Sequence, residues 1–394
     1  MDWIVFGDDW GSHPSTTQHL IRNLPDRDRI VWVNSIGGRA PRINRTDIGR
    51  MYRKLLSLTG NRKPRKRPMP MGAADQDAGW QPDLIVSPMV LPWHEVELVR
   101  RFNRRRLRKQ VEAAMHQVGF DRPNVLMSFP VATWYLDFPH GKVSYLRLDD
   151  YEKLPGVDAH LIRECEDRVL QTCDFVFVTA SSLVPDVPGV REKTHYIPQG
   201  VDARHFGTVP SQPPRSRVLG FFGLLAEWID FRMIAEVARR LPQWTFEFVG
   251  PVRYAPSSLT DLPNVRLLPP EPYTTLPDRL HTWDAAWIPF NVDKLTESVN
   301  PLKLREYLAA GLPTLCTEMP EARRLGEHVH VVQSSDDVVA FLSNVVGDDT
   351  AALREARKGS VRDHTWTERA RQLRDVFQNK PARREEPFPV PAKG

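Results

Sequence analysis

Residues 298–313, with the sequence SVNPLKLREYLAAGLP, carry more information about the architecture than any other segment of this chain of 394 residues. The Asn-Pro pair at 300–301 is a turn signal, and apolar residues recur at helical spacing from 302 to 309. Gly-Leu-Pro at 311–313 ends that helix, and the apolar run 314–317 predicts a strand. The segment therefore predicts a loop, a short helix and a strand in immediate succession.

The start of this helix combines features that suit a phosphorylated ligand. A helix N-terminus offers backbone N–H groups without helical partners and about half a positive charge. Lys303 adds a full charge in the first turn, and Glu306, one turn later, is placed to accept hydrogen bonds from a ribose diol. The two residues are compatible with a nucleotide diphosphate, although a solvated Lys–Glu pair on a helix surface fits the same pattern.

The segment resembles the donor-binding motif of GT-B glycosyltransferases of the family-4 type. In that family a Glu-x7-Glu pattern runs into a helix that ends in Ala-x-Gly-x-Pro. Glu306 matches the second glutamate, which holds the nucleotide ribose. Ser298 occupies the position of the first glutamate, which contacts hydroxyl groups of the donor sugar, and Glu297 stands one residue early. The match therefore departs from the family at the sugar contact.

The variant Asn-Pro-Leu-Lys at 300–303 is similar to a bacterial exopolysaccharide branch that includes the xanthan-type glucuronosyltransferases. In that branch the lysine of the motif faces the donor phosphates, and the resemblance gives this role to Lys303. The resemblance implies a set of donor-binding residues in the segment: Ser298, Asn300, Pro301, Leu302, Lys303 and Glu306.

Length and composition favour a globular protein of two domains. The chain is too long for one ordinary core, and its 41% hydrophobic and 26% charged residues are typical of a folded protein with a sizeable interior. No run of 18 apolar residues occurs, and residues 1–7 lack a basic region, so neither a transmembrane helix nor a signal peptide is predicted. The three cysteines lack metal-ligand spacing and fit a reducing cytoplasm.

Short apolar runs alternate with helical stretches in both halves of the chain, which is typical of βα units around a parallel sheet. The predicted fold class is α/β, with two doubly wound Rossmann-like domains facing a cleft, the GT-B arrangement. The N-terminal, acceptor-side domain is 1–207, a Pro-rich linker is 208–216, and the nucleotide-sugar-binding domain is 217–360. A closing helix at 361–378 and a disordered tail at 379–394 follow. Strands are predicted at 4–6, 30–33, 84–86, 125–127, 143–148, 175–178, 218–223, 244–250, 265–268, 285–289, 314–317 and 330–332.

The loop after the first strand, residues 7–15, precedes a predicted helix. Its position resembles the GT-B loop in which the backbone approaches the donor phosphates or the acceptor, and this resemblance places Gly11 and Ser12 there. His13 is a candidate proton acceptor or hydroxyl contact, and a histidine held by a structural hydrogen bond is equally compatible with the position. The loop lacks G-x-G-x-x-G, so no dinucleotide site is predicted.

Two adjacent carboxylates, Asp149 and Asp150, follow the predicted strand at 143–148. Adjacent like charges in a cleft raise one pKa, which suits a general base, whereas a strand-end aspartate that caps the next helix is the alternative. The xanthan-type branch has an aspartate base four residues after a tyrosine at the corresponding strand end. Because Asp149 is four residues after Tyr145, the resemblance implies Asp149 as the base and Asp150 as the second candidate.

Gly223 follows the first predicted strand of the second half, where family-4 enzymes carry a glycine turn and then an Arg and a Lys for the pyrophosphate. Those basic residues are absent, so Lys303 becomes the main cation on the phosphates, with Arg253 as a candidate helper. The resemblance places Tyr273 at the nucleobase, and a core or surface aromatic is the alternative. Lys303 and the helix dipole meet the phosphate charge and no Asp-x-Asp follows a strand, so neither a metal nor another cofactor is predicted.

Basic residues are concentrated in two segments, although the net charge is only +5. Ten lie in 42–67 beside one acid, and seven lie in 100–109 with no acid. Such segments suit anionic lipid, nucleic acid or acidic glycan, or form a solvated surface. Apolar residues interleaved at 51–58 favour an anionic membrane surface, and no nucleic-acid partner is expected.

These residues together predict a metal-independent glycosyltransferase that moves a sugar from a nucleotide-diphosphate sugar to a lipid-linked or glycan acceptor in cell-surface polysaccharide synthesis. We expect it in the cytoplasm, peripheral to the inner membrane surface. A carboxylate base at Asp149 favours inversion of the anomeric centre, whereas the family-4 resemblance points to retention. A nucleotide-sugar epimerase on the same fold and a non-catalytic basic nucleic-acid-binding protein are the alternatives.

Overall fold

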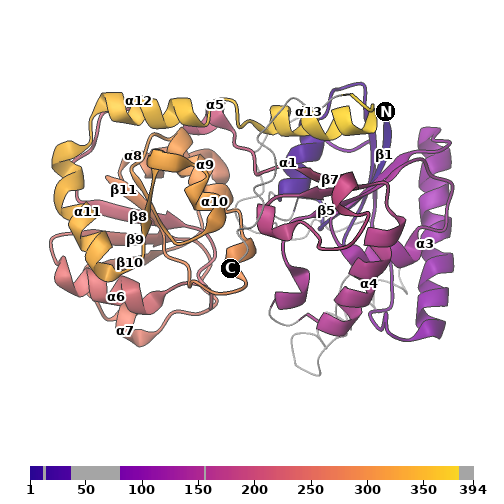
Figure 1. Ribbon diagram of the computed structural model, residues 1–394, viewed down its shortest axis with the longest axis horizontal. Helices are drawn as coiled ribbons and strands as arrows, with labels where there is room; N and C mark the ends of the chain where they lie inside the picture. The colour runs from indigo at the N-terminus through magenta and orange to yellow at the C-terminus, as the bar shows by residue number, and fades with distance from the viewer. Residues whose placement is uncertain (12–14, 37–79, 155–156, 381–394) are drawn as a thin grey trace, which may run out of the picture.

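The computed structural model of the chain describes residues 1–11, 15–36, 80–154 and 157–380. It contains two domains side by side, each built on a parallel sheet (Figure 1). Several predictions fall outside the described residues: Ser12, His13, the basic segment 42–67 and nearly all of the tail 379–394.

The first domain holds a seven-stranded sheet in the order β3-β2-β1-β4-β5-β6-β7, with parallel pairings throughout. Its strands are β1 (Asp2–Phe6), β2 (Arg29–Val33), β3 (Leu84–Val86), β4 (Asn124–Met127), β5 (Val143–Arg147), β6 (Phe175–Val178) and β7 (Thr194–Tyr196). Ile4 and Phe6 belong to one buried cluster, and Trp3 and Val5 belong to another, because successive side chains of a strand point to opposite faces. Burial on both faces explains why these strands read as uninterrupted apolar runs.

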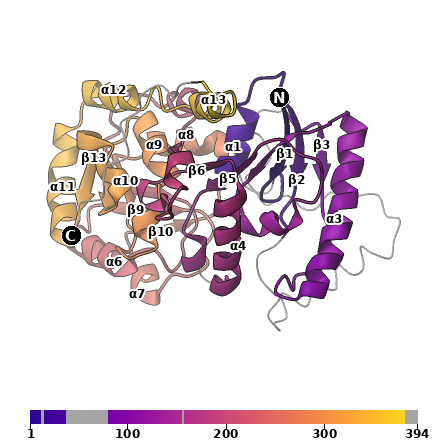
Figure 2. The same cartoon turned by 45° about the vertical axis from the view of Figure 1, so that its right-hand side comes forward.

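Helices cover both faces of this sheet (Figure 2). They are α1 (Thr16–Arg22), α3 (Glu97–Val118), the 3-10 helix η1 (Pro130–Tyr135) and α4 (Ala159–Thr172), and the last helix of the chain, α13 (Trp366–Phe377), joins them. The Phe377 ring lies 4.5 Å from the ring of Trp3, and Arg374 forms a 3.0 Å ion pair with Asp28. The predicted closing helix therefore crosses back to the first domain.

The second domain holds a six-stranded parallel sheet in the order β10-β9-β8-β11-β12-β13. Its strands are β8 (Val218–Phe222), β9 (Thr245–Val249), β10 (Val265–Leu268), β11 (Ala285–Ile288), β12 (Thr314–Thr317) and β13 (Val329–Val332). Its helices, preceded by α5 (Ala203–Phe206) in the connection, are α6 (Phe231–Arg240), α7 (Ser257–Thr260), α8 (Leu276–His281), α9 (Leu302–Ala309), α10 (Pro320–Arg323), α11 (Ser335–Asp348) and α12 (Ala351–Ser360). One continuous apolar core fills this domain.

The predicted α/β class with two doubly wound domains is confirmed, and each predicted strand is present. β7 is an addition that the sequence did not reveal, because its three residues, Thr-His-Tyr, show no apolar run. In both sheets the strand order reverses, between β1 and β4 in the first and between β8 and β11 in the second. The crevices beyond the carboxyl ends of strands at such switch points are where open α/β sheets bind ligands.

Candidate active site

Helix α9 begins beside the switch point of the second sheet. The chain leaves β11, passes through the short 3-10 helix η6 (Thr296–Ser298) and enters α9 at Pro301, whose extended backbone stands at the N-cap. Gly311 has a φ of +80° and ends the helical segment as predicted. The first N–H groups of α9 are therefore available at the carboxyl edge of this sheet, where they favour an anion.

Lys303 lies across the turn that follows β8. A Cβ atom added to Gly223 would stand 2.4 Å from Cε and 3.0 Å from Nζ of Lys303. The ammonium lies 5.8 Å from the ring centroid of Phe221 and 5.9 Å from that of Phe222. Burial lowers the pKa of Lys303, and the charge of Glu306 opposes this shift. The structure thus brings Gly223 and Lys303 together, and an anion in this place would favour the charged ammonium.

Gly223→Ala should both strain the backbone and displace Lys303. The φ of Gly223 is +140°, a conformation that L side chains rarely adopt, so we expect a loss of about 1–3 kcal/mol in the free energy of unfolding. The new methyl group would also push the Lys303 side chain away, so nucleotide affinity should fall. Urea unfolding measures the first effect, and the thermal shift produced by a nucleotide measures the second.

Gly326→Ala is the matched control. Gly326 also has a positive φ, +61°, but a Cβ atom there would have no neighbour within 4 Å among the described residues. This variant should lose stability and keep its nucleotide shift. An equal loss of nucleotide binding in both variants would mean that the effect at Gly223 comes from backbone strain alone and not from Lys303.

Glu306 lies one turn after Lys303 and is buried. Burial raises the pKa of Glu306 to about 7; the charge of Lys303 counteracts this shift, and the charge of Asp202 adds to it. Asp202 caps α5 and accepts a 2.9 Å hydrogen bond from the His205 backbone N–H. Sequence reasoning missed Asp202, because an aspartate before a short helix has the pattern of an ordinary cap. The structure therefore places a carboxylate whose pKa is about 7 beside Lys303.

Asp149 stands beyond the carboxyl end of β5 and is half-buried. Burial and the neighbouring charge of Asp150 raise the pKa of Asp149 to about 7, with no hydrogen bond from the described residues to offset the shift. Asp150 instead pairs with Lys153, with 2.7 Å between its carboxylate oxygen and Nζ. The two adjacent carboxylates thus differ in the structure: Asp150 is held in an ion pair, whereas the raised pKa of Asp149 suits a group that accepts a proton near neutral pH.

Asp8, in the loop after β1, is a carboxylate near this place that the sequence reading overlooked. The pKa of Tyr151 is raised well above its usual value by burial and, in part, by the charges of Asp149 and Asp8, so both carboxylates lie around one hydroxyl group. Asp8 accepts hydrogen bonds from the side chains of Ser15 (2.9 Å) and Gln18 (3.0 Å), which tie it to the start of α1. The position of Asp8 directly after a strand was the feature of the sequence that could have identified it as a site residue.

The side chain of Asn300 connects the two domains. Its amide group donates to the Thr179 carbonyl oxygen at 2.7 Å and to the Glu321 carboxylate at 3.2 Å, and its oxygen accepts from Arg305 at 2.7 Å. All of these contacts are with protein groups. Because the side chain of Asn300 is bonded to these groups, the prediction that Asn300 contacts the donor phosphates concerns its backbone and not its side chain.

Glu321, on α10, extends this connection. Its carboxylate is fully buried and accepts hydrogen bonds from the Ser181 backbone N–H at 2.8 Å and from the Tyr196 hydroxyl group at 2.6 Å, both in the first domain. Leu302 packs against a cluster that belongs mainly to the first domain, and Ser298 is buried close by in η6. The start of the predicted donor helix is thus held directly against the first domain.

Two other predicted donor residues have protein partners. Arg253 is exposed, lies 3.7 Å from the Glu227 carboxylate and covers the ring of Trp228 at 5.5 Å. The Tyr273 ring stacks on His205 with 4.6 Å between centroids. Within the described residues Arg253 is engaged with Glu227 and Trp228 and not with Lys303, whereas Tyr273 lines the cavity described next.

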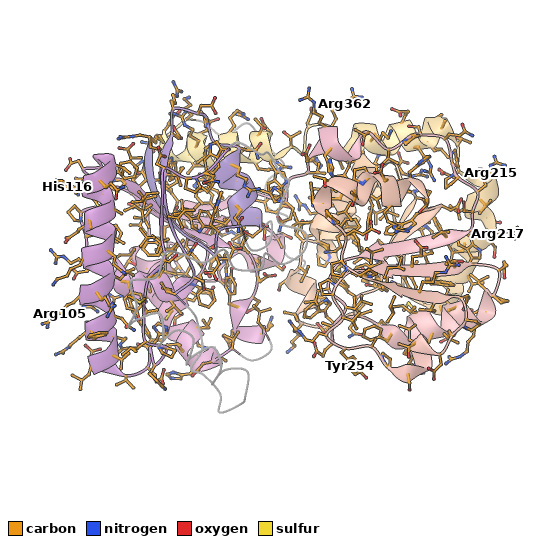
Figure 3. The ribbon with its side chains drawn as sticks, turned by 180° about the vertical axis from the view of Figure 1, so that it is seen from behind. Arg105, His116, Arg215, Arg217, Tyr254 and Arg362 are labelled. Carbon is orange, nitrogen blue, oxygen red and sulfur yellow. The ribbon has the colours of Figure 1, made fainter. Side chains whose placement is uncertain are left out.

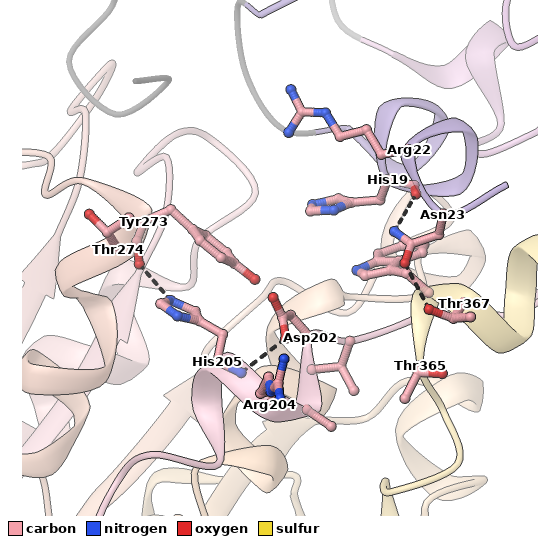
Figure 4. Close-up of a pocket in the computed structure, with 13 residues that line it drawn as sticks. His19, Arg22, Asn23, Asp202, Arg204, His205, Tyr273, Thr274, Thr365 and Thr367 are labelled. Carbon is pink, nitrogen blue, oxygen red and sulfur yellow. Dashed lines mark hydrogen bonds between the residues drawn. The ribbon is translucent and has the colours of Figure 1, made fainter. Parts of the chain in front are cut away.

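A cavity of about 320 Å³ opens between the domains at the connecting segment (Figure 4). His19 and Arg22 reach it from α1, Asp202 from the start of α5, and Tyr273 from the second domain. The cavity therefore joins the predicted nucleobase contact, Tyr273, to the carboxylate that influences Glu306. Gly11, in the loop before α1, has a φ of +72°, and no atom of the described residues lies within 4 Å of the position its Cβ would take.

The chain is similar to known glycosyltransferases. Residues 231–375 match a family described as glycosyl transferase-like. The Bacillus subtilis protein TuaH, assigned as a glycosyltransferase of teichuronic acid biosynthesis, is 30% identical over 235 residues. That alignment covers 54% of this chain and 59% of TuaH, so the chain matches little more than half the length of this relative.

Solved structures extend the likeness to almost the whole chain. The crystal structure of Anabaena HepE in complex with UDP-glucose has a TM-score of 0.65 at 13% identity and covers 96% of this chain and 100% of that chain. The sucrose-phosphate synthase of Thermosynechococcus elongatus has a TM-score of 0.62 at 12% identity, covering 96% and 98%. The chain has the GT-B glycosyltransferase fold. Within GT-B, its place in the xanthan-type branch stays a prediction.

The described residues of this GT-B chain contain neither a helix that could span a membrane nor a cluster of metal-binding side chains. None of the helices there combines the length and the apolar character that a membrane crossing needs. No group of three or more His, Cys, Asp or Glu residues in the same part of the chain has an arrangement that would hold a metal ion.

Proposed function

We propose that this GT-B chain is a glycosyltransferase that moves a sugar from a nucleotide-diphosphate sugar to a lipid-linked or glycan acceptor in cell-surface polysaccharide synthesis. The observation that carries the proposal is the placement of Lys303 over Gly223 at the start of α9, with Glu306 one turn behind it. The assigned role of TuaH in teichuronic acid biosynthesis supports the pathway, and the UDP-glucose complex of HepE makes UDP the first nucleotide to test.

Each group has one task in the proposed reaction. The acceptor oxygen attacks the anomeric carbon of the donor sugar, the bond from that carbon to the diphosphate oxygen breaks, and Asp149 takes the acceptor proton. Lys303 and the first N–H groups of α9 stabilise the charge on the departing diphosphate, while Glu306 accepts hydrogen bonds from the ribose. A base on the acceptor side favours inversion at the anomeric carbon.

We also propose that the enzyme needs no metal and works in the cytoplasm at the inner membrane surface. The ammonium of Lys303 and the dipole of α9 provide positive charge at the place where a metal would otherwise neutralise the diphosphate. The basic segments 42–67 and 100–109 supply the attraction to an anionic membrane.

Thermal unfolding with UDP, GDP, TDP and ADP, each with and without magnesium, tests the donor site. A nucleotide at about 100 times its dissociation constant adds about 2.7 kcal/mol to the free energy of unfolding. We expect one nucleotide to raise the midpoint without magnesium, and Glu306→Gln to reduce that rise because the amide replaces a carboxylate at the ribose. No shift with any nucleotide would contradict the proposal. A product released from the nucleotide sugar without an acceptor would indicate an epimerase instead.

A further inference from the structure

Exposed apolar side chains gather in one short part of the first domain. Eleven large apolar residues are exposed among those described, and six of them fall within 85–102. These six are Ile85, Leu91, Trp93, Val96, Leu98 and Phe102. Leu98 is 75% exposed and Phe102 is 47% exposed, and they stand four residues apart on α3, so they share one face of the helix. Scattered apolar residues are ordinary on a protein surface, but a concentration of this kind marks an interaction site.

The loop that carries part of this cluster is held in place by buried polar groups. Asn103 is fully buried; its amide group donates to the Leu91 carbonyl oxygen and its oxygen accepts from the Leu91 N–H, both at 2.8 Å. His94, also fully buried, forms a hydrogen bond with the Tyr135 hydroxyl group. These hydrogen bonds, on both sides of Trp93, hold the loop in a defined conformation in which the Trp93 side chain is exposed.

Positive charge surrounds the same apolar residues. The segment 100–109 contains seven basic residues and no acid. Arg106 lies over the ring of Phe102 at 5.9 Å, while Arg101 is neutralised by Glu97. Arg105 and Lys109 are exposed and form no ion pair within the described part of the chain, and Figure 3 shows Arg105 on the outer side of α3. Apolar side chains with a tryptophan among arginines match the boundary of an anionic bilayer, which accepts apolar tips and attracts cations.

The apolar cluster also lies at the edge of the sheet where Asp8 and Asp149 are found. Its loop follows the carboxyl end of β3, and β3 belongs to the same parallel sheet as β1 and β5. Parallel strands end at one edge, so the cluster shares that edge with the loop of Asp8 and with Asp149. We infer that residues 91–102, with the basic face of α3, dock the enzyme on an anionic lipid bilayer and so bring the acceptor side of the cleft to membrane-bound substrate. This inference rests on the proposed function for the identity of the substrate.

Cosedimentation of the full chain with lipid vesicles tests the docking surface. The chain should bind vesicles that contain phosphatidylglycerol, bind phosphatidylcholine vesicles weakly, and lose binding as salt is raised. The double variant Leu98→Ser and Phe102→Ser should lower vesicle affinity at least about tenfold. The double variant Arg105→Glu and Lys109→Glu should lower it by about fivefold or more for each residue changed.

The second domain offers matched controls. Leu353→Ser with Tyr254→Ser removes two exposed apolar side chains, and Arg362→Glu reverses one exposed charge. Figure 3 shows Tyr254 and Arg362 far from α3, and Leu353 belongs to α12, which Figure 1 shows in the other domain. These controls should keep vesicle binding. Equal binding by the α3 variants and the wild type would overturn the inference, and so would a change from dimer to monomer in the α3 variants without vesicles, since the surface would then join two copies of the chain.

The nucleotide shift separates this inference from the proposed function. The α3 variants should keep the full thermal shift with nucleotide, because Lys303 and Glu306 lie in the other domain. Lost vesicle binding with a preserved nucleotide shift supports the docking surface. A chain that binds nucleotide but never binds anionic vesicles overturns the docking surface alone, and a chain that binds vesicles but no nucleotide overturns the proposed function alone.

Discussion

Asp149→Asn should lower kcat by about 10²–10⁴-fold and leave nucleotide affinity within about twofold of the wild type. The substitution keeps the shape of the side chain and removes its ability to accept a proton. Donor contacts are expected to survive, because Lys303 and Glu306 stand on α9 of the second domain. Initial rates with donor and acceptor, together with the thermal shift produced by nucleotide, measure the two effects separately.

The pH dependence of the rate adds a second readout for Asp149. Since the pKa of Asp149 is about 7, the wild-type rate should rise as pH increases through 7 and the base ionises. Asp150→Asn should move this rise to lower pH, because the charge of Asp150 contributes to the raised pKa. Turnover by Asp149→Asn at the wild-type level, or loss of nucleotide binding in that variant, would remove Asp149 from the role of base.

The substitution Asp149→Asn should lower activity but raise the free energy of unfolding at pH 8. The pKa of Asp149 is raised in the folded protein above its ordinary value of 3.8, so the folded state holds a proton that the unfolded state has released between about pH 4 and 7. The contribution of the Asp149 carboxyl to stability is therefore fully present below pH 4, and it is lost as the pH rises through 7. Asp149→Asn should be more stable than the wild type at pH 8, an advantage that urea unfolding would show to shrink at low pH.

The sequence was sufficient for every strand of the two sheets except β7 and for the position of helix α9. The strands were predictable because they are buried on both faces, and α9 because a turn, a helical period and Gly311 follow each other within the same segment. Lys303 and Glu306 could be recognised because three residues separate them on that one helix. Local patterns of this kind depend only on near neighbours in the chain.

The connections between the domains could not be predicted in the same way. Asn300 meets Thr179 across 121 positions and Glu321 meets Ser181 across 140, and no local pattern records such pairs. The environments of Asp149 and Asp150 are likewise set by the fold: Lys153 pairs with Asp150, whereas burial and the charge of Asp150 raise the pKa of Asp149 to about 7. Tertiary contacts, not residue types, assign these roles.

Lys303→Met should lower kcat by about 10²–10³-fold and weaken nucleotide binding. Methionine keeps an apolar stem beside Phe221 and Phe222 but removes the charge that we propose faces the diphosphate. The loss extends to Glu306, because the charge of Lys303 holds the pKa of that carboxyl down against burial. In the variant this pKa should rise above about 7, so at neutral pH more of the carboxyl is protonated and fewer ribose hydrogen bonds can be accepted.

The pH dependence of binding distinguishes these two consequences of Lys303→Met. Raising the pH from 7 to about 9 should restore the contribution of Glu306 and recover part of the nucleotide affinity, whereas the lost contact to phosphate cannot return. Lys294→Met, at an exposed position in the preceding loop, is the matched control and should behave as the wild type. Unchanged turnover in Lys303→Met would mean that other groups neutralise the diphosphate, and it would place the donor phosphates away from α9.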